Sequence, residues 1–266
     1  MELLLYTGVF ALGLLMGSFL NVVVLRYHTG KGIGGRSACF SCGEQLTYLD
    51  LVPVLSFIFL RGRCRHCESR ISFQYPFVEV LSGFLFLFVY ITAGSLIEFI
   101  GMAAVFWLLL GIAVYDLRHK IIPDHFVYAV SVCALLMLFF DPVRQMATTP
   151  SLEALMAGPL TAFPLWLLWF VSRGRWIGLG DAKLALGIGW LLGVWGGVTV
   201  LAFSFWIGAV VSLILLGLHK LLQKTQLHVQ LRHITTKTEI PFAPFLIVST
   251  ILVYVFHLNL VTFLTW

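Results

Sequence analysis

Long apolar segments follow one another along most of the chain, and they limit its possible fold more than any other feature. Most are close to the roughly 20 residues that an α-helix needs to cross a bilayer. Eight such segments occur, at residues 3–25, 75–93, 97–116, 125–140, 154–172, 182–198, 200–219 and 243–263. The sequence therefore predicts an all-α polytopic membrane protein with about eight transmembrane helices.

The composition supports this prediction, because 60% of the residues are hydrophobic and only 11% are charged. Soluble domains contain about 25% charged residues. The first apolar segment has neither a basic stretch before it nor a small-residue cleavage site after it. We therefore expect it to be a retained helix and not a removed signal peptide.

The positions of lysine and arginine predict the orientation of the helices. With the N-terminus outside and eight spans, all but one of the 17 basic residues fall in cytoplasmic loops, and only Arg144 lies outside. This distribution satisfies the positive-inside rule. We expect both termini outside, and the net charge of +5 needs no nucleic-acid partner to explain it. The inside residues are Arg26, Lys31, Arg36, Arg61, Arg63, Arg65, Arg70, Arg118, Lys120, Arg173, Arg175, Lys183, Lys220, Lys224, Arg232 and Lys237.

The long loop after the first predicted helix contains two CxxC motifs. Cys39 and Cys42 form the first pair, and Cys64 and Cys67 form the second. Four thiolates at this spacing are typical of a structural zinc site, and metal binding would supply folding energy to so small a loop. A redox pair or free thiols are the alternatives, whereas disulfides are disfavoured on a cytoplasmic face.

His66 and Cys133 also have side chains that can bind a metal, but simpler interpretations are favoured for both. His66 lies inside the second CxxC motif and is a possible substitute ligand, although a solvated residue of a basic loop is the favoured interpretation. Cys133 lies in the fourth predicted helix, where we expect a small buried apolar side chain.

Two aspartates stand at the membrane boundary. Asp116 ends the third predicted span and Asp181 opens the sixth, so the topology places both at the cytoplasmic side. Two neighbouring carboxyl groups at a partly desolvated depth share one proton, which is the chemistry of aspartic peptidases. Gly178 and Gly180 would let a substrate strand or a neighbouring helix approach closely.

Other interpretations of these acids stay open on spacing alone. Each aspartate can be a carboxylate that faces headgroups or water at a helix end, and Asp181 suits a helix N-terminus. Paired intramembrane acids also carry protons in transporters. A transporter should place its acids near the bilayer midplane with repeat symmetry, which the sequence does not show. A zinc-folded membrane scaffold would give the two aspartates no task.

Motifs along most of the chain resemble one known family. They are "GSFLNVVVLR" (17–26), "DLVPVLSFIFLRGRCRHCESRISFQYPFVEVLSG" (50–83), "YDLRHKIIPD" (115–124), "GLGDAKLALGIG" (178–189) and "EIPFAPFLIV" (239–248). The chain resembles the bacterial type IV prepilin leader peptidases, which are intramembrane aspartic proteases of the GxGD class and are often also N-methyltransferases.

The resemblance implies that Asp116 and Asp181 are the catalytic pair and that Gly178 and Gly180 belong to the active-site loop. Methylating members of the family carry a large four-cysteine loop, and this chain has one. Members that methylate often carry an acid where this chain has Arg118, and the family's "PFGPF" reads "PFAPF" here, with Ala243 in place of glycine.

The resemblance also implies substrates, a second activity and a location. The expected substrates are prepilin and pseudopilin precursors, cut at the cytoplasmic face of the bacterial inner membrane. Methylation of the new N-terminus would use S-adenosylmethionine, and Glu79 is a candidate for the substrate or methyl-donor site, although a capped interfacial glutamate is an equal alternative. The expected domains are a first transmembrane helix (1–26), a cytoplasmic zinc domain (27–74) and a seven-helix membrane peptidase domain (75–266).

Overall fold

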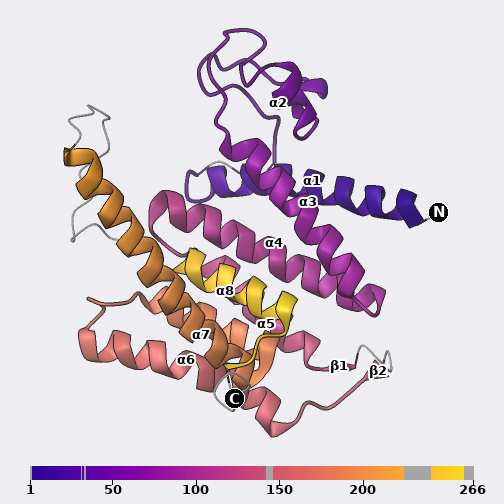
Figure 1. Ribbon diagram of the computed structural model, residues 1–266. Coiled ribbons are helices and arrows are strands. Elements are labelled where there is room, and N and C mark those ends of the chain that lie inside the picture. The colour runs from indigo at the N-terminus through magenta and orange to yellow at the C-terminus, as the bar shows by residue number, and fades with distance from the viewer. Residues whose placement is uncertain (1, 31, 33, 142–145, 225–240, 261–266) are drawn as a thin grey trace. The chain divides into compact units, whose positions relative to one another are not determined.

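The computed structural model describes residues 2–30, 32, 34–141, 146–224 and 241–260, and it describes no side chain at 141 or 219–224. Lys31, Arg144, Arg232 and Lys237, which entered the topology prediction, lie outside the described residues. Figure 1 shows the elements in order: α1 (Glu2–Arg26), η1 (Leu49–Leu51), α2 (Leu55–Phe59), α3 (Gln74–Thr92), α4 (Leu96–His119), α5 (Asp124–Met137), β1 (Phe140–Asp141), β2 (Met146–Ala147), α6 (Leu152–Ser172), α7 (Leu179–Lys224) and α8 (Ala243–Phe256).

The predicted helical membrane protein is confirmed. Five helices among the described residues are long and apolar enough to cross a membrane: α1, α3, α4, α6 and α7. The helices α5 and α8 are apolar but have 14 residues each. A helix of that length extends about 21 Å, which is shorter than a hydrocarbon core of about 30 Å. The eight predicted spans therefore correspond to fewer helices of full length.

The sixth and seventh predicted spans, 182–198 and 200–219, both lie in α7. The candidate span within α7 covers 40 residues, and a straight helix of that length would extend about 60 Å. Its backbone leaves the helical conformation at Gly193, where φ is 73° and ψ is 175°. Glycine adopts this conformation without a steric penalty. The break thus falls inside the sixth predicted span, because apolar content does not show where a helix turns.

The chain forms two compact units, and each is described by itself. The first comprises Met1–Val114 with Pro142–Met146, and the second comprises Tyr115–Asp141 with Ala147–Trp266.

In the first unit, α1 packs closely against α3. A Cβ atom on Gly17 would lie only 2.7 Å from the Cα atom of Glu79, so the contact requires a glycine. The Asn21 amide donates to the Tyr75 carbonyl oxygen at 3.2 Å, and such side chains join helices where no water is present. The long loop that contains the cysteines connects α1 to α3, and Figure 1 shows it at the top of the view, beyond the end at which α3 begins.

In the second unit, α6 and α7 form the largest interface. A Cβ atom on Gly189 would clash with the Ala157 carbonyl oxygen and would lie 2.7 Å from the Thr161 hydroxyl oxygen. Small residues of this kind allow helix backbones to approach closely in membranes.

We therefore expect Gly189→Ala to destabilise the protein, because overpacking a tight interface costs about 1–3 kcal/mol. Gly217→Ala is the matched control, since a Cβ atom at this exposed position of the same helix would meet nothing within 4 Å. Thermal unfolding in detergent measures the difference. Equal melting temperatures for the two variants would contradict the packing.

Candidate active site and metal centre

The two CxxC motifs fold into matching turns in the loop between α1 and α3. In the first turn the Cys39 amide donates to the Glu44 carbonyl oxygen at 2.9 Å, and in the second the Cys64 amide donates to the Ser69 carbonyl oxygen at 2.9 Å. Each turn has a left-handed residue directly after its second cysteine, with φ of 76° at Gly43 and 55° at Glu68. Antiparallel bridges, Ala38 to Gln45 and Arg63 to Arg70, close the two turns.

The turns bring the four cysteine sulfurs together. The sulfurs of Cys39, Cys42, Cys64 and Cys67 all lie within 4.8 Å of one another. Sulfurs bound at about 2.3 Å to a tetrahedral zinc ion lie about 3.8 Å apart, and the sulfurs of Cys39 and Cys67 are 3.8 Å apart. The group therefore fits a metal ion of this kind.

Local hydrogen bonds favour a thiolate in this cluster. The backbone amides of Cys42 and Ser41 donate to the Cys39 sulfur and lower the pKa of its thiol to about 6. Metal ligation requires a deprotonated cysteine, so the lowered pKa of Cys39 suits this role. Desolvation and the neighbouring sulfurs of Cys39 and Cys67 instead raise the pKa of Cys42 to about 11. Among the described residues the cluster includes neither His66 nor Cys133, and Cys133 belongs to α5.

The loop is braced by two buried carboxylates. Asp50 accepts from the Thr47 hydroxyl at 2.6 Å and pairs with Arg65 at 2.8 Å. The hydrogen bonds from Thr47, helped by Arg65, hold the pKa of Asp50 below its usual range. Glu79 in α3 accepts from the Val54 amide at 2.8 Å. Val54 has φ of 61°, a strained conformation for a β-branched residue, and this bond satisfies its amide.

Asp116 and Asp181 meet in the second unit. Asp116 lies in the last turn of α4, which ends where Lys120 adopts a left-handed conformation before Pro123. Asp181 lies in the first turn of α7, after a connection that begins with left-handed Arg173 and Gly174. The two side chains are 4% and 6% exposed. They interact electrostatically, so the structure brings the predicted pair together.

Each carboxylate accepts from backbone amides and has one unpartnered oxygen among the described residues. The Gly178 amide donates to Asp181 Oδ2 at 3.2 Å, and the Ala243 amide at the start of α8 donates to Asp116. Among the described residues, Asp116 Oδ2 and Asp181 Oδ1 are buried without a hydrogen-bond partner. Buried polar atoms normally have partners, so these two oxygens depart from the usual pattern within the part of the chain that the structure describes.

Contacts around the pair include some that the sequence did not predict. Lys183 forms an ion pair with Asp124 at 2.8 Å, which ties α7 to the first residue of α5. A Cβ atom on Gly180 would lie 3.0 Å from the Ile122 side chain, so this glycine allows the turn between α4 and α5 to approach α7. Gly178 lies in the connection before α7, whereas Gly180 is already in its first turn. Gly180 is therefore helical, and the role of the two glycines in an active-site loop stays a prediction.

Glu79 belongs to the first unit and the aspartate pair to the second. Its side chain is buried in α3 and is used by the Val54 amide, as described above. Its candidate role in substrate or methyl-donor binding stays a proposal.

Comparison with known proteins identifies the family. A prepilin leader peptidase/N-methyltransferase of Bacillus subtilis is 30% identical to the chain over 262 residues, which cover 96% of this chain and 95% of the relative. The chain belongs to the type IV leader peptidase family. Relatives of the same name in Pseudomonas putida and Myxococcus xanthus are 29% and 34% identical, over 90% and 78% of this chain and 86% and 62% of the relatives. No solved structure matches the chain significantly.

Each of the two candidate sites falls within a different family profile. The bacterial peptidase A24 N-terminal domain matches residues 11–93, which include all four clustered cysteines and Glu79. The type IV leader peptidase family profile matches residues 103–213, which include Asp116 and Asp181. The family resemblance seen in the sequence motifs is thereby confirmed.

Proposed function

We propose that this member of the type IV leader peptidase family cleaves the leader peptide of type IV prepilins and pseudopilins and then methylates the new N-terminus. The observation that carries the first activity is the buried pair Asp116 and Asp181, in which each carboxylate offers one unpartnered oxygen. The names of the relatives support both activities.

The pair supports aspartic-peptidase chemistry because only one of two interacting buried carboxyl groups ionises readily. The ionised carboxylate takes a proton from water, and the resulting nucleophile adds to the carbonyl carbon of the peptide. The protonated carboxyl group gives its proton to the carbonyl oxygen. When the C–N bond breaks, the amine leaves with a proton from the pair. The Gly178 and Ala243 amides hold the two side chains in place meanwhile.

The membrane setting supports a precursor that is itself embedded in the bilayer. Asp116 and Asp181 lie at helix ends, not at helix centres. With the predicted orientation, termini outside and loop 27–74 inside, both ends face the cytoplasm of a bacterial inner membrane. The family resemblance implies a precursor with a short basic leader followed by an apolar helix, and a leader on the cytoplasmic side would place the scissile bond beside the pair.

The two proposed cofactors would bind to different segments of the chain. Zinc on Cys39, Cys42, Cys64 and Cys67 would fold the domain at 27–74, between the helix at 1–26 and the peptidase domain at 75–266. S-adenosylmethionine would supply the methyl group when bound, and Glu79 is the candidate residue for its site or for the substrate. The chain carries Arg118 where methylating relatives often have an acid, so methylation needs its own test.

One experiment tests the two activities separately. A purified precursor and its mature form are each incubated with wild type and with an Asp116→Asn/Asp181→Asn double variant, with isotopically labelled S-adenosylmethionine present. We expect wild type to cleave the precursor and methylate the product, and we expect the double variant to methylate only the mature form. Mass spectrometry reads both changes. A wild type that cleaves without methylating would reduce the proposal to a peptidase, and one that leaves the precursor intact would contradict it.

A further inference from the structure

The loop between α1 and α3 carries an exposed apolar face. It consists of Tyr48 and Leu49 at η1 and Leu55, Ile58 and Phe59 of α2, and these five side chains are 52–86% exposed. The two short helices contact each other, so the residues belong to one surface. Single exposed apolar residues are normal on proteins, whereas a contiguous group of this kind marks an interaction site.

Phe57, which points away from the exposed apolar face, fixes the orientation of α2. Phe57 packs edge-on against Phe73, with ring centroids 6.1 Å apart. It also covers Gly62, where a Cβ atom would lie 3.0 Å from the Phe57 ring. Because residues three and four apart share one face of a helix, the inward Phe57 leaves Leu55, Ile58 and Phe59 pointing outward together.

Basic residues follow the apolar face directly. Arg61 and Arg63 come next in the chain and are exposed. Arg63 has only a 3.9 Å contact with the exposed Glu68, which neutralises little of its charge. Arg65 is instead paired with Asp50 at 2.8 Å. The edge of the apolar face is therefore positively charged, which complements anionic headgroups.

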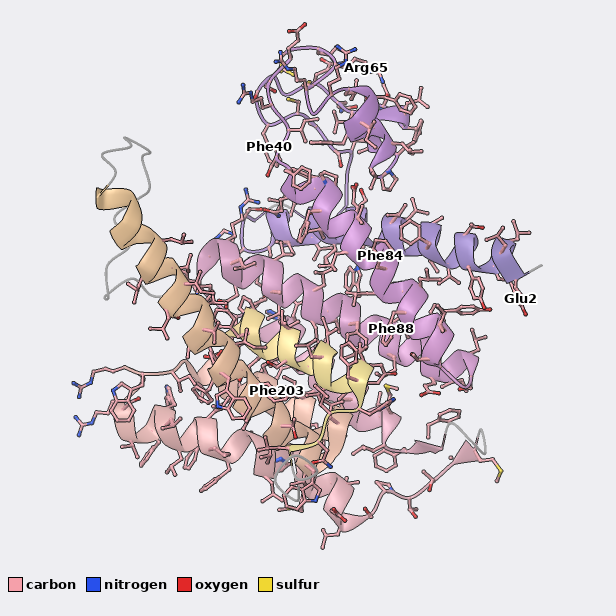
Figure 2. The ribbon with its side chains drawn as sticks, viewed as in Figure 1. Glu2, Phe40, Arg65, Phe84, Phe88 and Phe203 are labelled. Carbon is pink, nitrogen blue, oxygen red and sulfur yellow. The ribbon has the colours of Figure 1, made fainter. Side chains whose placement is uncertain are left out.

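The two ends of the loop hold this surface near the bilayer. The loop continues from α1 and into α3, and both are candidate membrane spans. Phe73 and Phe77, where the loop enters α3, are also exposed. Figure 2 shows the loop side chains, including Phe40 and Arg65, spread around the outside of this compact segment.

We propose that the apolar face of η1 and α2 lies in the membrane interface, with Leu55, Ile58 and Phe59 among the lipids and with Arg61 and Arg63 at anionic phosphates. The element is an amphipathic interfacial anchor of a loop that two spanning helices already tether. Its function is to keep the four-cysteine segment flat against the surface from which a precursor leader emerges. The membrane contact itself does not depend on the proposed peptidase activity.

The test uses the full-length protein in lipid nanodiscs, with and without anionic lipid. A photo-crosslinking amino acid replaces Phe59, and the crosslinked partner is identified by mass spectrometry. We expect adducts with lipid, more abundant in anionic nanodiscs. Arg61→Gln/Arg63→Gln should remove this preference for anionic lipid, whereas Arg36→Gln, an exposed basic residue of the same loop, should leave it unchanged. Adducts with protein, from a second copy or from elsewhere in the chain, would overturn the proposal.

Amide hydrogen exchange supplies a second readout. Ile58→Glu/Phe59→Glu should speed exchange several-fold at residues 55–63 in nanodiscs, and it should leave the amides at 39–42 and 64–67 unchanged. Both positions are exposed, so the loop should still fold, and bound metal content verifies that it does. Unchanged exchange at 55–63 in a variant that retains its metal would also overturn the proposal.

Discussion

Asn at either Asp116 or Asp181 should reduce leader cleavage by roughly 10²–10⁴-fold, the usual contribution of general acid–base catalysis, and the double variant should lose little more. The reason is that the two carboxyl groups act on one shared proton, and residues that act as a unit have strongly non-additive effects. Asn retains a side-chain oxygen that can accept from the Gly178 or Ala243 amide. The local fold should therefore survive, and initial rates on a purified precursor measure the loss.

Asp124→Asn is the matched control for this prediction. Asp124 is an acid of the same unit, but its side chain is 53% exposed and its partner is Lys183. Loss of an exposed ion pair costs about 0.2–1 kcal/mol, so we expect cleavage to change only a few-fold. A different result would contradict the shared-proton mechanism. If each single variant at Asp116 or Asp181 lost only a modest part of the cleavage rate, and the two losses multiplied in the double variant, the two groups would work independently.

The sequence predicted the aspartate pair because topology and motif agree. Counting spans placed Asp116 and Asp181 at one membrane boundary, and the family resemblance gave them a role. The amide partners were beyond sequence reasoning, since the Ala243 amide comes from a helix 127 positions after Asp116 and backbone donors have no sequence signal. The Lys183–Asp124 ion pair joins residues 59 positions apart, and a charged pair at a boundary looks solvated until the helices are placed.

The helix boundaries also show that the sequence predicts features set by neighbouring residues and misses features set by distant contacts. The ends of α1, α3 and α6 lie within two residues of the predicted spans, because the change from apolar to polar residues is a local signal. Gly193 interrupts α7 among several other glycines, and composition does not distinguish it from them. Glu79 was predicted as a candidate binding residue or a capped glutamate. Its bond to the Val54 amide depends on how the loop folds back, which the local pattern does not show.

Replacement of Cys64 should remove the metal and unfold the loop. Cys64 is the buried member of the four-cysteine cluster, and structural zinc contributes about 10–16 kcal/mol to folding in small motifs. We expect about one zinc ion per wild-type chain and almost none in Cys64→Ser, together with rapid proteolysis between residues 36 and 70. Elemental analysis and limited proteolysis in detergent measure the two effects.

Cys133→Ser is the control, because Cys133 lies in α5 and outside the cluster. It should retain the metal and the protected loop. Counting free thiols tests the disulfide alternative. If no disulfide is present, protein that is denatured and stripped of metal by a chelator should titrate all five cysteines as free thiols. Fewer free thiols without a reductant would show that the sulfurs are joined covalently, and the short sulfur–sulfur distances would then have a different cause. A full thiol count with no bound zinc in wild type would leave the loop to be held by Asp50, Arg65 and Glu79.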